Sequence, residues 1–246
     1  MNLILIDPQE VRADGRVRLD DQRAAHARDV LRASPGKILR VGLLNGPLGK
    51  GTVERKTTDS VTLYCEWETD APLRPPVDLL LAMPRPKVLK RLWAQLAALG
   101  IGRIILINAK KVERFYFDTH VLKPAFYTKR LIEGLQQARD TRLPDVTVVK
   151  QLKPFLEDEM NALFPKSEKR IIADPSGPRT VSQCLHSAPK RACLAVGPEG
   201  GWTSYELKLF EKHGFEAFSV GSRILRTDTA CIALISLLAE SLRNKV

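Results

Sequence analysis

The chain has 246 residues, of which 44% are hydrophobic and 27% are charged, and its formal net charge is +11. This composition predicts a globular protein with an ordinary core, formed by one large domain or by a medium and a small one. The longest apolar runs, at 77–83 and 231–239, are too short to span a membrane, and the N-terminus lacks the pattern of a secretory signal. We therefore expect a cytoplasmic protein.

Short strands are predicted up to about residue 70, where apolar runs alternate with turn residues. These strands are expected at 2–6, 16–19, 38–44, 49–57 and 60–68, with one helix at 20–33. Strands at this spacing suit a small β-barrel. The next segment, ETDAPLRPPVD at 68–78, contains three prolines and predicts a stiff connector. We place the domain boundary there, with domains at 1–70 and 77–246.

Past the connector, strands alternate with helices, which predicts an α/β domain with a mostly parallel sheet. The expected strands are 77–83, 103–108, 146–150, 170–174, 192–196 and 216–220, and the expected helices are 87–99, 123–140, 154–163, 203–213 and 227–242. Ligands on such sheets bind at the carboxyl ends of the strands. Three of these ends are polar or glycine-rich: ADPSGP (173–178), VGPEGGW (196–202) and VGSRILRTDT (220–229).

Cysteine and histidine are dispersed along the chain, with four of each. The cysteines are Cys65, Cys184, Cys193 and Cys231. Their spacing matches neither a CxxC pair nor a small disulfide framework, so each is predicted to be a buried, reduced thiol. No metal site is expected, because no His/Cys cluster is visible.

Positive charge is concentrated in the middle of the chain. Residues 77–150 contain 14 Lys and Arg against 6 Asp and Glu, whereas 1–76 contain 12 against 11 and 151–246 contain 13 against 11. A concentrated positive field attracts phosphate backbones and favours a nucleic-acid partner. A solvated face that keeps the protein soluble would explain the same excess.

Two loops have residue patterns typical of binding sites. The glycines of LAVGPEGGWTSYEL (194–207) permit positive φ and the close approach of a ligand, although a simple turn would also explain them. In the later loop, Thr227 is a natural N-cap and Asp228 suits the positive end of a helix dipole. Arg226 has no such stabilising role at a helix N-terminus, where it would instead attract an anion or an electron-rich base.

VGPEGGWTSYEL followed by VGSRILRTDTA resembles the signature pair of the RsmE family. That family consists of SPOUT-class methyltransferases that modify N3 of a uridine in small-subunit (16S) ribosomal RNA. The resemblance extends along most of the chain. It implies an RNA-binding PUA-like β-barrel at 1–70, followed at 77–246 by a SPOUT-type α/β methyltransferase domain with a trefoil knot. It also implies S-adenosyl-L-methionine as cofactor, ribosomal RNA or the small ribosomal subunit as partner, and a homodimer.

The same resemblance implies the site residues. The loops of the knot hold the cofactor mostly through backbone groups, and Leu225 would contact the adenine in this way. The full set expected to bind the cofactor is Asp174, Gly197, Glu199, Gly200, Gly201, Val220, Leu225, Arg226 and Thr229. Because N3 of uridine carries a proton, we expect Arg226 to stabilise the negative charge that develops on the uracil. Asp228 or Glu199 is expected as a base or an orienting group, although each has a capping or loop role available.

The expected RNA contacts come from the basic middle segment. They are Lys87, Lys90, Arg91, Arg139 and Arg142, although each alone is better explained as an ordinary surface charge. Trp202 and Tyr205, beside the glycines, either stack on a base or pack in the core.

The chain departs from the family pattern on the side expected to face the substrate. The departures are Val88, Ala98, Gln136 and Asp140. Cofactor binding therefore carries over more directly than the identity of the target nucleotide. Three alternatives stay open: a SPOUT methyltransferase for a different RNA base, a noncatalytic RNA-binding knot protein, and an enzyme of another class whose glycine-rich loop binds a phosphate ligand. The absence of a Walker motif or a strand-linked GxGxxG disfavours the last.

Overall fold

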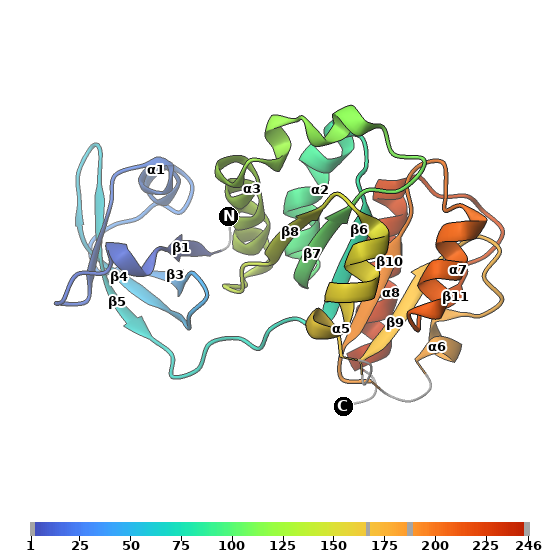
Figure 1. Cartoon of the computed structure of the whole chain (residues 1–246). Helices are drawn as coiled ribbons and strands as arrows, with labels where there is room; N and C mark the ends of the chain where they lie inside the picture. The colour runs from blue at the N-terminus through green and yellow to red at the C-terminus, as the bar shows by residue number, and fades with distance from the viewer. Residues whose placement is uncertain (1–2, 166–167, 186–188, 244–246) are drawn as a thin grey trace. The chain divides into compact units, whose positions relative to one another are not determined.

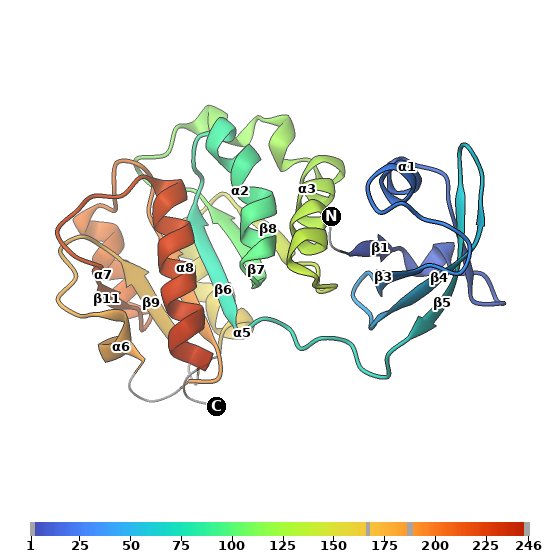
Figure 2. The ribbon, with the colours of Figure 1, turned by 180° about the vertical axis from the view of Figure 1, so that it is seen from behind.

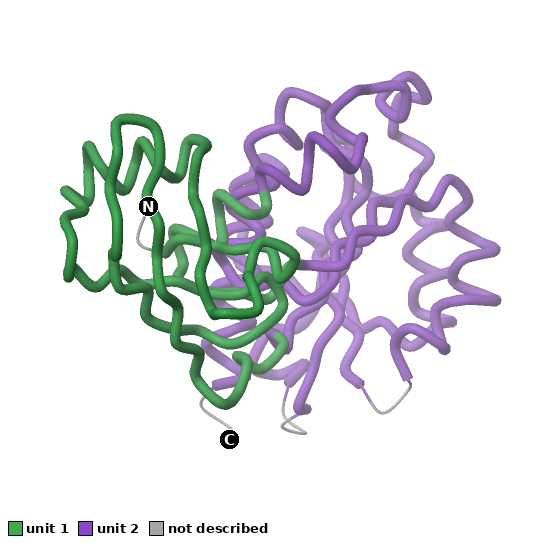
Figure 3. Tube along the Cα trace, turned by 90° about the vertical axis from the view of Figure 1, so that its left-hand side faces the viewer, with its two compact units in different colours: residues 1–74, 131–143 green, residues 75–130, 144–246 purple. Residues whose placement is uncertain are grey.

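The computed structural model describes residues 3–165, 168–185 and 189–243, and the chain divides into two compact units (Figure 3). Unit 1 comprises residues 1–74 and 131–143, and unit 2 comprises residues 75–130 and 144–246. The sequence places 131–143 in the second domain. The structure groups this segment with the N-terminal strands, because its hydrogen-bond partners lie there.

Unit 1 contains a curled five-stranded sheet in the order β1-β3-β4-β5-β2. The strands are β1 (Ile4–Ile6), β2 (Arg16–Leu19), β3 (Ile38–Leu43), β4 (Leu48–Lys56) and β5 (Val61–Trp67). β1 and β3 are parallel, and the other neighbours are antiparallel. Alternate side chains of β2 and β5 are buried, as expected for strands with one face on a core. Helix α1 (Gln22–Asp29) covers this core with Ala24 and Ala27, and Asp21 caps its N-terminus.

The segment 131–143 is bound to the turn between β3 and β4. Thr141 Oγ1 donates to the carbonyl of Gly46 (2.6 Å), and Arg142 Nη1 donates to that of Asn45 (3.0 Å). Asp140 accepts the backbone N–H groups of Thr141 (2.6 Å) and Arg142 (3.0 Å). Asp140 is one of the four departures from the family pattern, and in this chain its carboxylate organises the turn after helix α3 (Pro124–Ala138).

Unit 2 contains a six-stranded sheet in the order β11-β9-β10-β6-β7-β8, in which every neighbouring pair is parallel. The strands are β6 (Val77–Ala82), β7 (Ile101–Ile107), β8 (Asp145–Val149), β9 (Lys169–Ala173), β10 (Ala192–Val196) and β11 (Glu216–Phe218). All residues of the central strands β6 and β10 are buried, as expected for a parallel sheet covered on both faces. The expected α/β architecture is confirmed.

Helices cover both faces of this sheet. α2 (Pro86–Ala98) and α8 (Thr227–Arg243) pack side by side on one face (Figure 2). α5 (Met160–Leu163) and α7 (Ser204–Lys212) lie on the other (Figure 1). Among the described residues, no helix is long and apolar enough to cross a bilayer.

Several local predictions were wrong. The single helix expected at 154–163 is a continuous helical run at 152–163, in which α4 (Leu152–Pro154) is followed by a π-helical turn (Phe155–Glu159) and α5. β11 ends at Phe218, since the N–H and hydroxyl of Ser219 donate to the carbonyls of Arg179 and Gly177. Three 3₁₀ turns and a short helix were not predicted: Pro8–Glu10, Arg114–Phe117, His120–Leu122 and α6 (Val181–Cys184).

Candidate active site

A pocket of about 140 Å³ lies at the carboxyl ends of β9, β10 and β11, which are neighbours in the parallel sheet. Its lining comes from the three loops that follow these strands, within 173–175, 196–202 and 218–227, together with Ala230 and Leu234 of α8. The polar and glycine-rich strand ends therefore meet at one edge of the sheet, where ligands of such folds bind.

Most of the expected cofactor-binding residues line this pocket. They are Asp174, Gly197, Glu199, Gly201, Val220 and Leu225. Gly200, Arg226 and Thr229 are exposed and lie outside the lining. Sequence reasoning missed Thr227, Ala230 and Leu234, although their spacing of three and four residues places them on one helix face.

The glycines of the second loop serve both the turn and the packing. Gly201 has φ +70°, which a residue with a side chain rarely adopts. A Cβ at Gly197 would come within 3.1 Å of the indole of Trp202. Trp202 is 7% exposed, and its ring centroid is 4.9 Å from that of Phe210. Trp202 therefore packs in the core, whereas Tyr205 is 62% exposed.

One buried polar side-chain atom of the lining has no partner in the described part of the chain. Trp202 Nε1 is buried, and no acceptor for its N–H lies among the described residues. A buried donor without an acceptor costs about 1–3 kcal/mol, and buried polar groups of this kind are rare in native proteins. A ligand with an acceptor atom in the pocket would satisfy it.

The first loop is organised by Asp174. Its carboxylate accepts the N–H of Ser176 (2.9 Å) and the hydroxyl of the same residue, and its own N–H donates to the carbonyl of Phe218 (3.0 Å). A Cβ at Gly177 would lie 2.4 Å from the carbonyl carbon of Phe218. Glycine is required there because the backbone of Phe218, the last residue of β11, passes directly over it.

Glu199 joins the second loop to helix α2. Its Oε1 accepts the N–H of Arg85 at 3.2 Å, and Arg85, the N-cap residue of α2, makes no side-chain cap of its own. Glu199 thus supplies the carboxylate that a capping box would place within the helix. No partner of its Oε2 lies among the described residues, and Glu199 lines the pocket.

Asp228 is ion-paired rather than free. Its Oδ2 lies 3.0 Å from Nη2 of Arg91 on α2, and its Oδ1 accepts the N–H of Thr229 at 3.0 Å. Arg226 is exposed, between the lining residues Leu225 and Thr227, and no partner of its guanidinium lies in the described part of the chain. Helix α8 begins at Thr227, so the prediction of Thr227 as the N-cap was wrong by one residue. Thr227 is buried, and it lines the pocket.

Two contacts attach the second loop to the loop after β7, and sequence reasoning missed both. Lys111 Nζ donates to the carbonyl of Gly200 at 2.7 Å. Glu206 is 4% exposed and accepts the N–H of Lys110 (2.8 Å) and both the N–H and the hydroxyl of Thr203 (2.7 and 2.6 Å). The S/T-x-x-E pattern of 203–206 identifies the capping box between Thr203 and Glu206. No local pattern indicates that Glu206 also accepts the N–H of Lys110.

The five expected RNA contacts do not lie on one element. Lys87, Lys90 and Arg91 are exposed on α2 of unit 2. Arg139 and Arg142 belong to unit 1, where the guanidinium of Arg142 donates to the carbonyls of Pro72 and Asn45. RNA contact by these residues stays a prediction.

The cysteines are all buried and free, which confirms the prediction of reduced thiols. Burial raises the pKa of the Cys231 thiol to about 12 and that of Cys65 to about 11. Both are protonated near neutral pH and are poor nucleophiles. No group of three or more His, Cys, Asp or Glu within the described ranges could hold a metal ion.

Comparison with known proteins gives consistent similarities. A family model described as RNA methyltransferase domain matches residues 71–239. Ribosomal RNA small subunit methyltransferase E of Treponema pallidum is 32% identical over 247 residues, which cover 98% of this chain and 92% of that protein. Ribosomal RNA small subunit methyltransferase E 1 of Borreliella burgdorferi is 28% identical, with 99% and 100% covered.

A similar fold is present in a solved structure. This is the crystal structure of a ribosomal RNA small subunit methyltransferase E from Neisseria gonorrhoeae bound to S-adenosyl methionine. It aligns with a TM-score of 0.76 at 20% identity, with 98% of this chain and 97% of that chain covered. At this identity the likeness concerns the fold.

Proposed function

The chain belongs to the ribosomal RNA small subunit methyltransferase E family, and from this premise we propose that it transfers a methyl group from S-adenosylmethionine to N3 of a uridine in 16S ribosomal RNA. The observation that carries the proposal is the pocket formed by the loops after β9, β10 and β11. The two signature motifs of the sequence supply two of these loops, 196–202 and 218–227.

The lining suits the proposed cofactor. Val196, Leu225 and Leu234 provide apolar surface for a purine, and Trp202 Nε1 is a buried donor that lacks an acceptor among the described residues.

When bound, the cofactor supplies an electrophilic methyl group on a sulfonium. The protein then has to orient the uracil and stabilise the charge left when its N3 proton departs. Arg226 is our candidate for this second task, because its guanidinium is exposed beside the pocket and has no internal partner in the described ranges. Arg226→Lys keeps the charge but not the planar fork, and Arg226→Ala removes both. We expect kcat to fall in Arg226→Lys and to fall further in Arg226→Ala, with cofactor affinity unchanged in both variants.

The two carboxylates differ as proton acceptors. Glu199 lines the pocket and has one oxygen without a partner in the described part of the chain, so it is the better candidate for the base. Asp228 holds Arg91, so its role is to position that side chain. Glu199→Gln should lower kcat, because it removes the proposed proton acceptor. Asp228→Asn should lower kcat less, because that carboxylate is held by Arg91 and is not the proposed acceptor.

The remaining parts of the proposal concern the fold and the assembly. We propose that residues 1–70 form a PUA-like barrel that binds RNA, and that the chain of the domain at 77–246 is knotted. The knot would bring the three loops together at the pocket edge. We also propose a homodimer, supported by Ile232 and Leu237 of α8, which are 37% and 46% exposed in the single chain. Sedimentation of the wild type and of a variant with both residues changed to Glu tests the dimer.

The decisive experiment is tritiated methyl transfer to small ribosomal subunits from a strain that lacks this gene, with mapping of the labelled base. Label on N3 of one uridine is the expected result. Label on another base would mean that the departures at Val88, Ala98, Gln136 and Asp140 go with a changed substrate. Cofactor binding without any label on the subunits or on their free RNA would favour a noncatalytic RNA-binding protein.

A further inference from the structure

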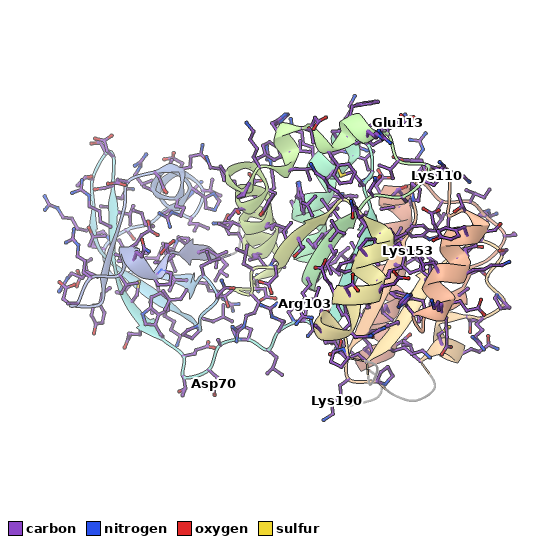
Figure 4. The ribbon with its side chains drawn as sticks, viewed as in Figure 1. Asp70, Arg103, Lys110, Glu113, Lys153 and Lys190 are labelled. Carbon is purple, nitrogen blue, oxygen red and sulfur yellow. The ribbon has the colours of Figure 1, made fainter. Side chains whose placement is uncertain are left out.

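A second pocket, of about 610 Å³, lies next to the candidate active site. Side chains from three segments line it: the loop after β7, the residues that follow β8, and the first turns of α7. Figure 4 labels two of its lysines, Lys110 in the loop after β7 and Lys153 on α4. The active-site loop ends where this lining begins, since Trp202 lines the first pocket and Thr203 lines the second.

The lining carries an excess of positive charge. Lys110, Arg114, Lys150 and Lys153 line the pocket, and all four are exposed. The only acidic residue of the lining is Glu206, whose oxygens already accept three hydrogen bonds.

Little within the chain neutralises these cations. Lys153 lies 4.0 Å from Glu157, an exposed pair of the kind that contributes little. No ion-pair partner of the other three cationic side chains lies among the described residues. Glu113, Asp118, Asp158 and Glu159 are further exposed carboxylates near these cations in sequence, but none of them lines the pocket.

An aromatic side chain and an unsatisfied acceptor accompany the charges. Tyr205 lines the pocket and is 62% exposed, so one turn of α7 presents its ring to solvent. Asn108 Oδ1 is buried and has no partner in the described part of the chain. Exposed aromatic rings beside basic grooves are how proteins bind single-stranded nucleic acid, because the ring stacks on a base and the cations follow the phosphates. An amide oxygen can accept from an amino or imino N–H at a base edge.

We propose that this pocket binds a single-stranded stretch of the RNA substrate, with one base on Tyr205 and the phosphates at Arg114, Lys150 and Lys153. The proposal rests on the proposed function. It adds the place at which the protein holds the RNA next to the target nucleotide. Tyr205 follows the glycine-rich loop by three residues, so a strand held there leads to the cofactor pocket. Lys111 donates to the carbonyl of Gly200 in that loop, and its neighbour Lys110 donates its N–H to Glu206 within the lining of the second pocket.

The test uses a labelled single-stranded RNA of about 12 nucleotides, within the site sizes known for such proteins. Its affinity for the full chain is measured by fluorescence anisotropy at several salt concentrations. Each phosphate contact to a single strand contributes about 0.7 to the slope of log affinity against log salt. The triple variant Arg114→Glu, Lys150→Glu, Lys153→Glu should therefore reduce the slope by about 2. If charge reversal prevents folding, the corresponding triple Gln variant is used instead, and its salt slope should fall in the same direction.

A matched control changes three exposed lysines that lie outside the pocket, Lys190→Glu, Lys208→Glu and Lys212→Glu, and it should leave the slope within about 0.5 of wild type. Tyr205→Ala should lower affinity about tenfold without changing the slope, because stacking carries no charge. Equal slopes in the pocket variant and the control would overturn the proposal. So would full affinity in Tyr205→Ala.

The readouts separate this proposal from the proposed function. Cofactor binding, followed by calorimetry, should be unchanged in all variants, since none of the altered residues lines the first pocket. If the wild type methylates RNA but the pocket variant keeps the wild-type slope, only the pocket proposal fails. If the wild type binds RNA with the expected slope difference but methylates nothing, only the proposed function fails.

Discussion

Glu206 is the side chain whose replacement should reveal most about how the active-site loop is held. It is 4% exposed, with Oε1 on the N–H of Lys110 and Oε2 on the N–H and hydroxyl of Thr203. Glu206→Gln keeps the shape but replaces one oxygen by an amino group. In either orientation of the amide, that amino group faces a backbone N–H. One buried donor is therefore left unsatisfied, whichever contact survives.

The expected cost follows from this count. An unsatisfied buried donor costs about 1–3 kcal/mol, and a weakened cap adds up to about 1 kcal/mol, so we expect Glu206→Gln to lower the free energy of unfolding by about 2–3 kcal/mol. For 150–250 residues this corresponds to a fall in Tm of roughly 4–12 °C. The assay is urea denaturation followed by tryptophan fluorescence, because Trp202 lies four residues from the substitution.

Glu211→Gln is the matched control, on the same helix but exposed. It should change stability by less than about 0.5 kcal/mol. Equal effects of the two substitutions would refute the role given to Glu206. A second readout is cofactor affinity, which should fall only in Glu206→Gln, because that substitution loosens the end of the loop at 197–203.

Four further outcomes are expected. Trp202→Phe should lower cofactor affinity about tenfold in calorimetry, since it removes the buried N–H, and unchanged affinity would show that no ligand atom uses this donor. Gly177→Ala should cost at least about 3 kcal/mol in urea denaturation, because its Cβ would lie 2.4 Å from Phe218 backbone; wild-type stability would contradict the packing described. The hydrogen bond from Arg23 holds the pKa of Glu10 below its ordinary 4.5, so Glu10 stabilises the fold above that pH and loses this effect as pH falls through the lowered pKa. Glu10→Gln should therefore destabilise the protein at pH 7 and progressively less below pH 4.5, and a pH-independent difference would contradict the ion pair. The four cysteine thiols should react with a thiol reagent only in denaturant, and fast labelling of the native chain would show that one is accessible.

Local patterns in the sequence predicted most of the fold. The central parallel strands have continuous apolar runs, and the strands of unit 1 alternate apolar with polar residues. Both patterns located their strands to within a few residues. The edge of the sheet that carries the pocket was predicted for the same reason, because parallel strands place their carboxyl ends together. The prediction that Asp174, Gly197 and Leu225 bind the cofactor, and so lie at this pocket, rested on the family resemblance and not on periodicity.

The failures involve contacts between residues distant in sequence. Nothing near Glu199 indicates that it caps α2, 114 positions away from it at Arg85. Asp228 fits a helix N-terminus by local rules, and only the fold shows its ion pair with Arg91. The basic pocket also escaped notice, because its cations belong to two separate stretches and Tyr205 to a third.

Unit 1 is formed by two separate stretches of the chain, and this has a consequence for its folding during synthesis. Its strands end by residue 67, yet its last piece, 131–143, is made only after β6 and β7 of the other unit. At roughly 5–20 residues per second, the 69 positions between 74 and 143 add about 3–14 seconds before the partners of Asn45 and Gly46 emerge from the ribosome. During that interval the turn between β3 and β4 has no partner for these carbonyls except water. The nascent N-terminal unit therefore gains these two hydrogen bonds only after the middle of the chain has been translated.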